Sequence, residues 1–325
     1  MRPLTEQRRA IAAGTGRTGQ AGIRQEDMPK ILSVLSDQLY SNPIAAVVRE
    51  YSCNAADAHI EAGKADLPFE VILPTIFIPE FVVRDRGPGL AEQDIYDVYM
   101  MYGCSTKENT NQLKGMFGLG SKAAYAYTSA FTIISYHGGK KTTYAAIVDA
   151  DHQRSVTEMG EEDSDETGIE IRVHVQKTDI FKFKAEAESL FRWFEVKPDC
   201  PELELPEMKK GTYLEDPRCL LLKNWKGTVE SPWSVVMGNV AYRLPIDQFF
   251  EELEKEKAVD TRIESLTLAS FFKKSHGVLW FDIGTVTPHP SREVLTIDKA
   301  TKRNIMARLR EVVKAVDLEL CGLLD

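Results

Sequence analysis

The sequence predicts an α/β (α+β) protein in which helices cover one face of a mostly antiparallel sheet. Three observations support this fold class. Apolar residues recur at helical spacing from Glu26 to about Tyr40. Short runs rich in Val, Ile, Phe and Thr follow, as is typical of strands. Two of these runs, FTIISY and TTYAAIVDA, are joined by HGGK, which predicts a β-hairpin.

Local start and stop signals place the elements of the first half. The second helix opens near Ser41 with Pro43 in its first turn, and Gly63 suits its end. Strands are expected at 69–73 and 81–85, and DRGPG ends the second of them. The later elements are expected in this order: a helix over 91–102, a loop over 103–120, a small-residue helix SKAAYAYT, the hairpin, a polar loop EEDSDETG and a strand IEIRVHV.

A second domain is predicted because the composition changes near 195–217, where Pro and Glu are frequent. A chain of 325 residues is also long enough for two domains. The expected units are a flexible segment at 1–24, a first domain at 25–195, a linker at 196–217 and a smaller α/β domain at 218–325. The last unit contains strand-like VAYRL and GVLWFDI, an acidic helix around 246–257 and an amphipathic helix from about 298 to 320.

Bulk properties argue for a cytoplasmic protein that does not coat nucleic acid. The formal charge of -9 is opposite in sign to a phosphate-binding footprint. No run approaches the roughly 20 apolar residues of a membrane span, and no apolar signal core opens the chain. Five scattered cysteines without a CxxC pair predict free thiols. The sequence GTGRTG matches GxGxxG, but no strand precedes it, so we reject a dinucleotide site there.

The segment LYSNPIAAVVREYSCNAADAH at 39–59 places a polar row on a helix. At about 100° per residue, Glu50, Asn54 and Asp57 border the stripe that is expected to be buried. Such a row predicts a site, although ordinary boundary positions would look alike. The face expected to lie opposite, toward solvent, consists of Arg49, Ser52 and Ala56.

Two glycine-bearing stretches add chemistry. In the run 85–89, DRGPG, an Asp at a strand end is followed by two glycines, which predicts a carboxylate at a pocket floor that a flat ligand approaches. In the run 115–120, GMFGLG, free amides before a helix would attract phosphate oxygens. Each has a plainer alternative, namely a tight turn for the first and a hinge for the second.

The order ExxxNAxDA, DxGxG and GxFGxG over about 40–175 resembles the GHKL ATPase superfamily. Its members include DNA gyrase B, the ninety-kilodalton heat-shock chaperones, histidine kinases and the MutL proteins, and residues 39–58 look most like the chaperone branch. Residues 290–295, PSREVL, resemble the SRE-type motif of that branch. The combination is also similar to phage rapid-lysis proteins of the rII A type.

The resemblance implies a Bergerat-fold sandwich that binds ATP and Mg²⁺ beneath a mobile lid, followed by a transducer-like domain at 218–325. It assigns Glu50 as general base, Asn54 as the Mg²⁺ ligand and Asp85 as acceptor for the adenine amino group. Arg292 would reach the γ-phosphate, with a surface Arg–Glu pair as the alternative. The other residues that it assigns to cofactor binding are Asp57, Gly87, Gly89, Lys107, Gly115, Phe117, Gly118 and Gly120. For Lys107 the alternative is a solvated loop lysine.

One position departs from the family pattern. Many relatives carry Gly-Thr on the strand after the lid, with the hydroxyl near adenine, whereas this chain has Gly168-Ile169. Either Thr167 substitutes for that hydroxyl or nucleotide affinity is reduced.

Two functions follow as hypotheses. The first is a slow Mg-ATPase that acts as a conformational switch on a protein partner, in an ATP-dependent homodimer that uses residues 1–24. The second is a nucleotide-gated binding module with negligible hydrolysis, for example a phage protein that engages a host factor. A histidine kinase is not expected, because no H-box helix precedes the first domain. A topoisomerase is not expected either, because the remainder has no room for a cleavage domain.

Overall fold

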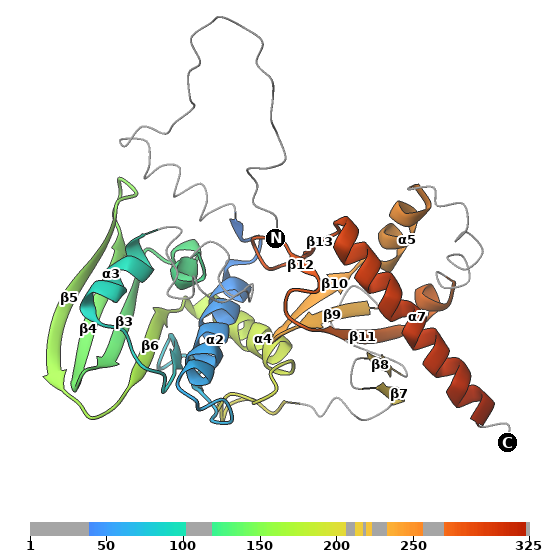
Figure 1. Ribbon diagram of the computed structural model, residues 1–325. Helices are drawn as coiled ribbons and strands as arrows, with labels where there is room; N and C mark the ends of the chain where they lie inside the picture. The colour runs from blue at the N-terminus through green and yellow to red at the C-terminus, as the bar shows by residue number, and fades with distance from the viewer. Residues whose placement is uncertain are drawn as a thin grey trace, which may run out of the picture.

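The computed structural model describes residues 39–101, 119–205, 212–216, 219–222, 233–255 and 270–322. Figure 1 shows two sheets with the helices α2 and α4 between them. A six-stranded sheet lies on one side, and a five-stranded sheet with the long helix α7 lies on the other. Most of the predicted helix at 26–40 and most of the predicted loop at 103–120 lie outside the described residues.

The six-stranded sheet has the order β1-β2-β6-β3-β4-β5, and all its neighbouring strands are antiparallel. This arrangement confirms the predicted fold class. The predicted hairpin is formed by β3 and β4, and Gly138 and Gly139 take positive φ values of 62° and 82° at its turn. The strands are β1 (Glu70–Ile72), β2 (Glu80–Arg84), β3 (Ala130–His137), β4 (Lys140–Val148), β5 (Arg154–Asp163) and β6 (Gly168–His174).

The edge strand β5 was not predicted, and part of it falls in the stretch expected to be a loop. Its last residues pair with β4, with Asp163 opposite Lys140 and Glu162 opposite Lys141. Both cross-strand pairs form ion pairs, at 2.9 Å and 2.5 Å. Most side chains of β5 are exposed, so the strand lacks the apolar alternation by which a sequence reveals a strand.

Helices cover one face of this sheet (Figure 1). As predicted, α2 begins with Pro43, and its N-cap Asn42 accepts a hydrogen bond from the Ala45 amide at 3.0 Å. The small-residue helix SKAAYAYT forms as a 3-10 helix. The helices of this half are α2 (Pro43–Glu61), α3 (Glu92–Met100), η3 (Gly120–Ala126), η4 (Lys177–Asp179) and α4 (Ile180–Phe191).

The core lies between these helices and the sheet. The predicted stripe of α2 is buried at Val47, Tyr51 and Ala55. The prediction that Arg49 and Ser52 face solvent is wrong, because Arg49 is 6% exposed and Ser52 is fully buried. Helix α2 is covered on both faces, and tertiary packing from the second half of the chain provides part of the second cover.

The five-stranded sheet has the order β10-β9-β11-β8-β7, in which β9 and β11 are parallel. Helix α7 packs Ile305, Leu309 and Val312 into its core. The elements are β7 (Thr212–Asp216), β8 (Cys219–Leu222), β9 (Trp233–Met237), β10 (Val240–Leu244), α5 (Ile246–Lys255), β11 (His276–Phe281) and α7 (Lys299–Gly322), with a separate hairpin of β12 (Thr287–Pro288) and β13 (Leu295–Thr296).

The two halves touch through aromatic rings. Trp193, just after α4, meets Trp280 of β11 with ring centroids 6.5 Å apart. The division into domains at 196–217 stays a prediction. In the described part of the chain, no helix combines the length and the apolar character that a membrane crossing requires. Cys53, Cys200 and Cys219 are buried free thiols, as predicted.

Candidate functional site

Glu50 on α2 is a buried carboxylate held between two guanidinium groups. Its Oε1 accepts from Nε of Arg49 at 3.0 Å, and its Oε2 accepts from Nη1 of Arg292 at 3.0 Å. The Glu50 side chain is only 5% exposed, whereas that of Arg292 is 28% exposed. Both carboxylate oxygens are therefore occupied by cations that water screens weakly.

The electrostatics of Glu50 result from opposing effects. Burial acts to raise its pKa, but Arg292 and Arg49 together outweigh burial and hold the pKa of the Glu50 carboxyl below its usual value. The same carboxylate raises the pKa of Arg292 well above its ordinary value. Burial also raises the pKa of the nearby Cys53 thiol to about 11, so this thiol stays protonated at neutral pH. In this arrangement Glu50 is ionised.

Arg292 reaches Glu50 from the loop of the β12–β13 hairpin. Its φ of 55° lies in the left-handed region, which is unusual for a residue with a side chain. Its amide donates to the carbonyl of His289 at 2.8 Å, and the amide of His289 donates to the carbonyl of Val294 at 2.8 Å. The loop is thus closed by its own hydrogen bonds. Arg292 thus forms an Arg–Glu pair with Glu50 of the first half of the chain, and its role at the γ-phosphate stays a prediction.

Further hydrogen bonds attach this loop and its arginine to the rest of the chain. Nη2 of Arg49 donates to the Ser291 carbonyl at 2.7 Å. The Glu293 carboxylate accepts from the backbone and hydroxyl of Ser41, and from the backbone of Asn42. Arg292 also hydrogen-bonds the buried Tyr242 of β10, which links the second sheet to the helix that carries Glu50.

The turn after β2 forms the other end of the candidate site. Oδ1 of Asp85 accepts from the amide of Gly87 at 2.8 Å and from the amide of Ile169 at 3.2 Å. The amide of Asp85 in turn donates to the carbonyl of Ile169 at 2.9 Å. Gly168 lies so close that a Cβ there would stand 2.0 Å from the Asp85 carbonyl oxygen, at a φ of 119°. The pair Gly168-Ile169 therefore lies beside Asp85, and the residue next to the carboxylate carries no hydroxyl.

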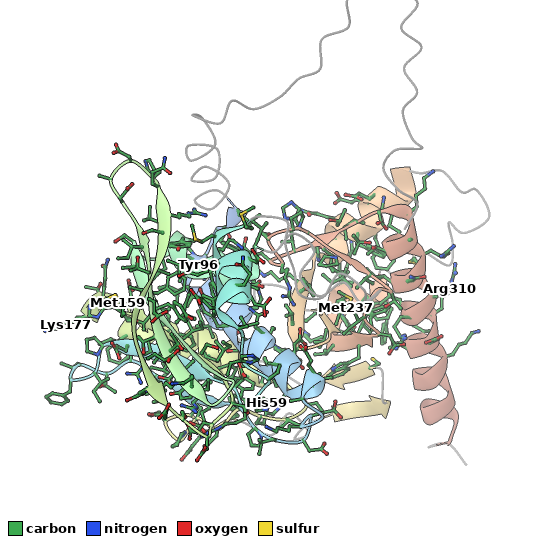
Figure 2. All side chains as sticks on the ribbon, turned by 60° about the vertical axis from the view of Figure 1, so that its left-hand side comes forward. His59, Tyr96, Met159, Lys177, Met237 and Arg310 are labelled. Atoms are coloured by element: carbon green, nitrogen blue, oxygen red, sulfur yellow. The ribbon has the colours of Figure 1, made fainter. Side chains whose placement is uncertain are left out.

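His59 ties this turn to the end of α2, where Figure 2 labels it. Its Nδ1 lies 2.7 Å from the Leu67 carbonyl, and its Nε2 accepts from the Arg86 amide at 2.7 Å. These two contacts require a neutral ring with the proton on Nδ1. The ammonium of Lys64 donates to the Arg86 carbonyl at 2.7 Å. The backbone next to Asp85 is thereby held on both sides.

Helix α2 sets the distance between the two ends of the candidate site, which are Glu50 and the turn after β2. At Gly120 a Cβ would meet Oε2 of Glu50 at 2.6 Å, so the last residue of the glycine-rich stretch lies directly against this carboxylate. At Gly87 a Cβ would meet that of Ala58 at 2.7 Å. Positions 50 and 58 are about 12 Å apart along a helix, at 1.5 Å per residue. The glycine-rich stretch and the β12–β13 hairpin thus contact α2 at Glu50, and the turn after β2 contacts it at Ala58.

The predicted residues between these points differ in exposure. Asn54 is exposed, Asp57 is half-buried and Asp85 is buried. Gly89 has a φ of 72° and packs where a Cβ would stand 2.2 Å from the Tyr136 carbonyl oxygen, so the fold itself requires glycine there. Lys107, Gly115, Phe117 and Gly118 lie outside the described residues.

Arg49, His59, Tyr242 and Glu293 were not predicted as site residues. Arg49 was placed on the solvent side, and the others carry no motif of their own. A signal existed only for Glu293, which is the acidic neighbour of Arg292 in PSREVL. Among the described residues, no group of three His, Cys, Asp or Glu side chains is arranged to hold a metal ion.

Comparison with known proteins supports the family that the motifs indicated. Residues 40–179 match the family model described as histidine kinase-, DNA gyrase B-, and HSP90-like ATPase. The chain is also 34% identical over 130 residues to one of the subunits of the type 2 DNA topoisomerase 6 of Archaeoglobus fulgidus. That similarity covers 36% of this chain and 19% of the relative. Both findings support a GHKL-type ATPase domain, and the chain spans only a small part of this relative's length.

Proposed function

We propose that this chain binds ATP and Mg²⁺ along α2, hydrolyses the nucleotide slowly, and couples its occupancy to the docking of the β12–β13 hairpin. The observation that carries the proposal is the buried, ionised Glu50 between Arg49 and Arg292. Glu50 stands where the family motif has its general base. Arg292 comes from the hairpin whose sequence resembles the phosphate-contacting motif of the chaperone branch.

The residues present fit this ligand chemically. The exposed Asn54 offers an amide oxygen, which suits a hard cation that keeps several waters. The buried Asp85 offers a carboxylate oriented by two backbone amides, as an acceptor for the adenine amino group. The backbone at Gly120 and the guanidinium of Arg292 are the candidates for the phosphates. When bound, Mg-ATP would supply the bond that is broken and the metal charge that offsets phosphate repulsion.

Glu50 needs a movement of Arg292 before it can act as a base. Each of its oxygens accepts from a guanidinium, and its depressed pKa makes it a weak proton acceptor. A general base works best when its pKa lies near the working pH. Withdrawal of Arg292 would free Oε2 and allow burial to raise the pKa of Glu50. The position of the hairpin would thus control the strength of the base.

Turnover measurements test this mechanism. Glu50→Gln is expected to retain ATP binding and to lose turnover by about 10²–10⁴-fold. Asp85→Asn is expected to weaken ATP binding by about tenfold or more, because it removes a charged acceptor. Glu61→Gln is the matched control, since it changes an exposed glutamate at the end of the same helix. Equal turnover in wild type, Glu50→Gln and Arg292→Met would remove hydrolysis by this site.

The alternative is a nucleotide-gated binding module with negligible hydrolysis. Two observations favour it. Glu50 is ion-paired with both Arg49 and Arg292, and an isoleucine lies beside Asp85. A phage protein that engages a host factor is one form of this alternative. Tight ATP binding with turnover no faster than background would support the module and contradict the ATPase.

The finer family and the assembly belong to the same proposal. We place the chain in the chaperone-type branch, with the phage rII A type as a narrower form, on the motifs of α2 and PSREVL. The topoisomerase relative is by name part of a larger assembly, which favours a protein partner here too. Light scattering after size exclusion, without nucleotide, with ADP and with a non-hydrolysable ATP analogue, tests the homodimer. A mass that stays unchanged in all three states would contradict ATP-dependent dimerisation.

A further inference from the structure

We propose that Glu293 is a positioning residue, which docks the β12–β13 hairpin on the N-cap of α2 and thereby holds Arg292 beside Glu50. The docking itself is independent of nucleotide, whereas its effect on turnover rests on the proposed function. Glu293 touches none of the groups assigned to the nucleotide. It would act on the site only through Arg292.

The carboxylate of Glu293 caps α2 from outside the helix. Its Oε2 accepts from the Ser41 amide at 3.2 Å and from the Ser41 hydroxyl at 2.9 Å. Its Oε1 accepts from the Asn42 amide at 3.1 Å. Backbone amides at a helix start lack partners within the helix, and the start favours negative charge. The first turn of α2 contains no acidic residue, so Glu293 supplies that charge from 251 residues away.

The hairpin loop sends neighbouring side chains to two separate points of one helix. Glu293 contacts positions 41 and 42, while Arg292 contacts Glu50. Positions 42 and 50 are about 12 Å apart along a helix axis. The left-handed backbone of Arg292 and the bond from the Glu293 amide to the Ser291 hydroxyl at 3.4 Å shape the loop between the two contacts.

This two-point attachment explains why opposite charges follow one another in the loop. The acidic residue meets the positive end of α2, and the basic residue meets the buried carboxylate further along. One contact orients the hairpin for the other. Loss of the Glu293 contact should therefore weaken the Arg292–Glu50 pair even though neither of its members is changed.

Amide hydrogen exchange without nucleotide tests the docking directly. In Glu293→Ala, the amides of Ser41 and Asn42 should exchange at least about tenfold faster, because both amides donate to this carboxylate. Glu293→Gln keeps an acceptor oxygen and should give an intermediate rate. Glu311→Ala is the control, since it removes an exposed glutamate from an ion pair on α7. Unchanged exchange at Ser41 and Asn42 would overturn the docking.

A double-mutant cycle tests the coupling to Arg292, again without nucleotide. Arg292→Met changes the unfolding equilibrium constant by some factor. In the Glu293→Ala background this factor should be at least about fivefold smaller than in wild type. An equal effect in both backgrounds would overturn the positioning role, whether or not the chain hydrolyses ATP. Failure of the proposed ATPase would appear separately, as turnover at background in wild type.

Steady-state kinetics then distinguish positioning from a general loss of structure. Glu293→Ala should raise kcat by about tenfold, because Arg292 is then held less firmly on Oε2 of Glu50, and should leave KM for ATP within about twofold, because Glu293 itself lies outside the groups that hold the nucleotide. Glu293→Gln should give an intermediate kcat, whereas a general loss of structure would lower kcat. A KM that rises with kcat unchanged would contradict the inference, since it would place Glu293 in nucleotide binding.

Discussion

Replacement of Arg292 by methionine removes one of the two counter-ions of Glu50. Methionine keeps much of the length and volume of the side chain but cannot donate a hydrogen bond. The Glu50 side chain is 5% exposed and would retain only Arg49, at 3.0 Å. The variant therefore leaves a buried carboxylate with half of its charge compensation.

The expected loss of stability follows from the geometry. Breaking a buried pair by removing its only partner costs about 3–5 kcal/mol. Here Arg49 remains and Arg292 is 28% exposed, so we expect about 2–3 kcal/mol. For a cooperative unit of about 150–250 residues, each kcal/mol lowers Tm by about 2–4 °C. The midpoint should therefore fall by about 4–12 °C at neutral pH.

The dependence on pH gives the sharper test. In wild type the folded pKa of Glu50 is lowered, so its contribution to stability is present above its unfolded pKa of about 4.3 and is lost as pH falls through the lower, folded pKa. In Arg292→Met, burial meets less opposition and the folded pKa rises. The gap in unfolding free energy between variant and wild type should then be widest near pH 8 and should narrow toward pH 5.

Calorimetry and urea unfolding between pH 5 and 8 measure this gap. Arg303→Met is the matched control, because it replaces an exposed arginine on α7 and should change stability by less than about 0.5 kcal/mol. A gap that is absent, or that widens toward pH 5, would refute the view that Arg292 stabilises an ionised Glu50.

Three further substitutions test other contacts of the site. Gly168→Ala should destabilise the fold by about 2 kcal/mol or more and weaken ATP binding, whereas Gly160→Ala, whose Cβ meets nothing within 4 Å, should do neither in the same urea and binding titrations. Tyr51→Phe removes the hydroxyl that hydrogen-bonds the Ser121 carbonyl and the Ala124 amide. The urea midpoint should fall by the equivalent of about 1–3 kcal/mol with an unchanged slope. A midpoint equal to that of Tyr96→Phe would contradict this expectation. His59→Ala should free the turn after β2, so that amide exchange at Arg86 accelerates and ATP affinity falls, and exchange at the wild-type rate would show that His59 does not hold the turn.

Local signals were sufficient for much of the first sheet and its helices. Pro43 marked the start of α2, the glycine turn marked the β3–β4 hairpin, and apolar runs marked β1, β2 and β6. These features depend on contacts between residues close in sequence or on a periodic buried face. The edge strand β5 was missed because its pairing relies on exposed charges across from β4. Such pairs leave no periodic pattern in the sequence.

The burial of Arg49 shows what a helical periodicity in the sequence cannot predict. A helical projection places Arg49 opposite the apolar stripe, which is correct as geometry. It cannot show that a hairpin about 240 residues later covers this second face and accepts a hydrogen bond from Arg49. The same hairpin brings Arg292 to Glu50 and so gives this carboxylate its second counter-ion.

By itself, the sequence determined the residue types of the candidate site and the helix that carries Glu50 and Asn54, because motif order and helical periodicity are properties of the chain alone. Only the tertiary structure decided that Arg292 meets Glu50 and that Glu293 caps the start of α2. Those contacts depend on how two sheets pack around one helix, and pairings across some 250 residues have no local cause that a sequence pattern could reveal.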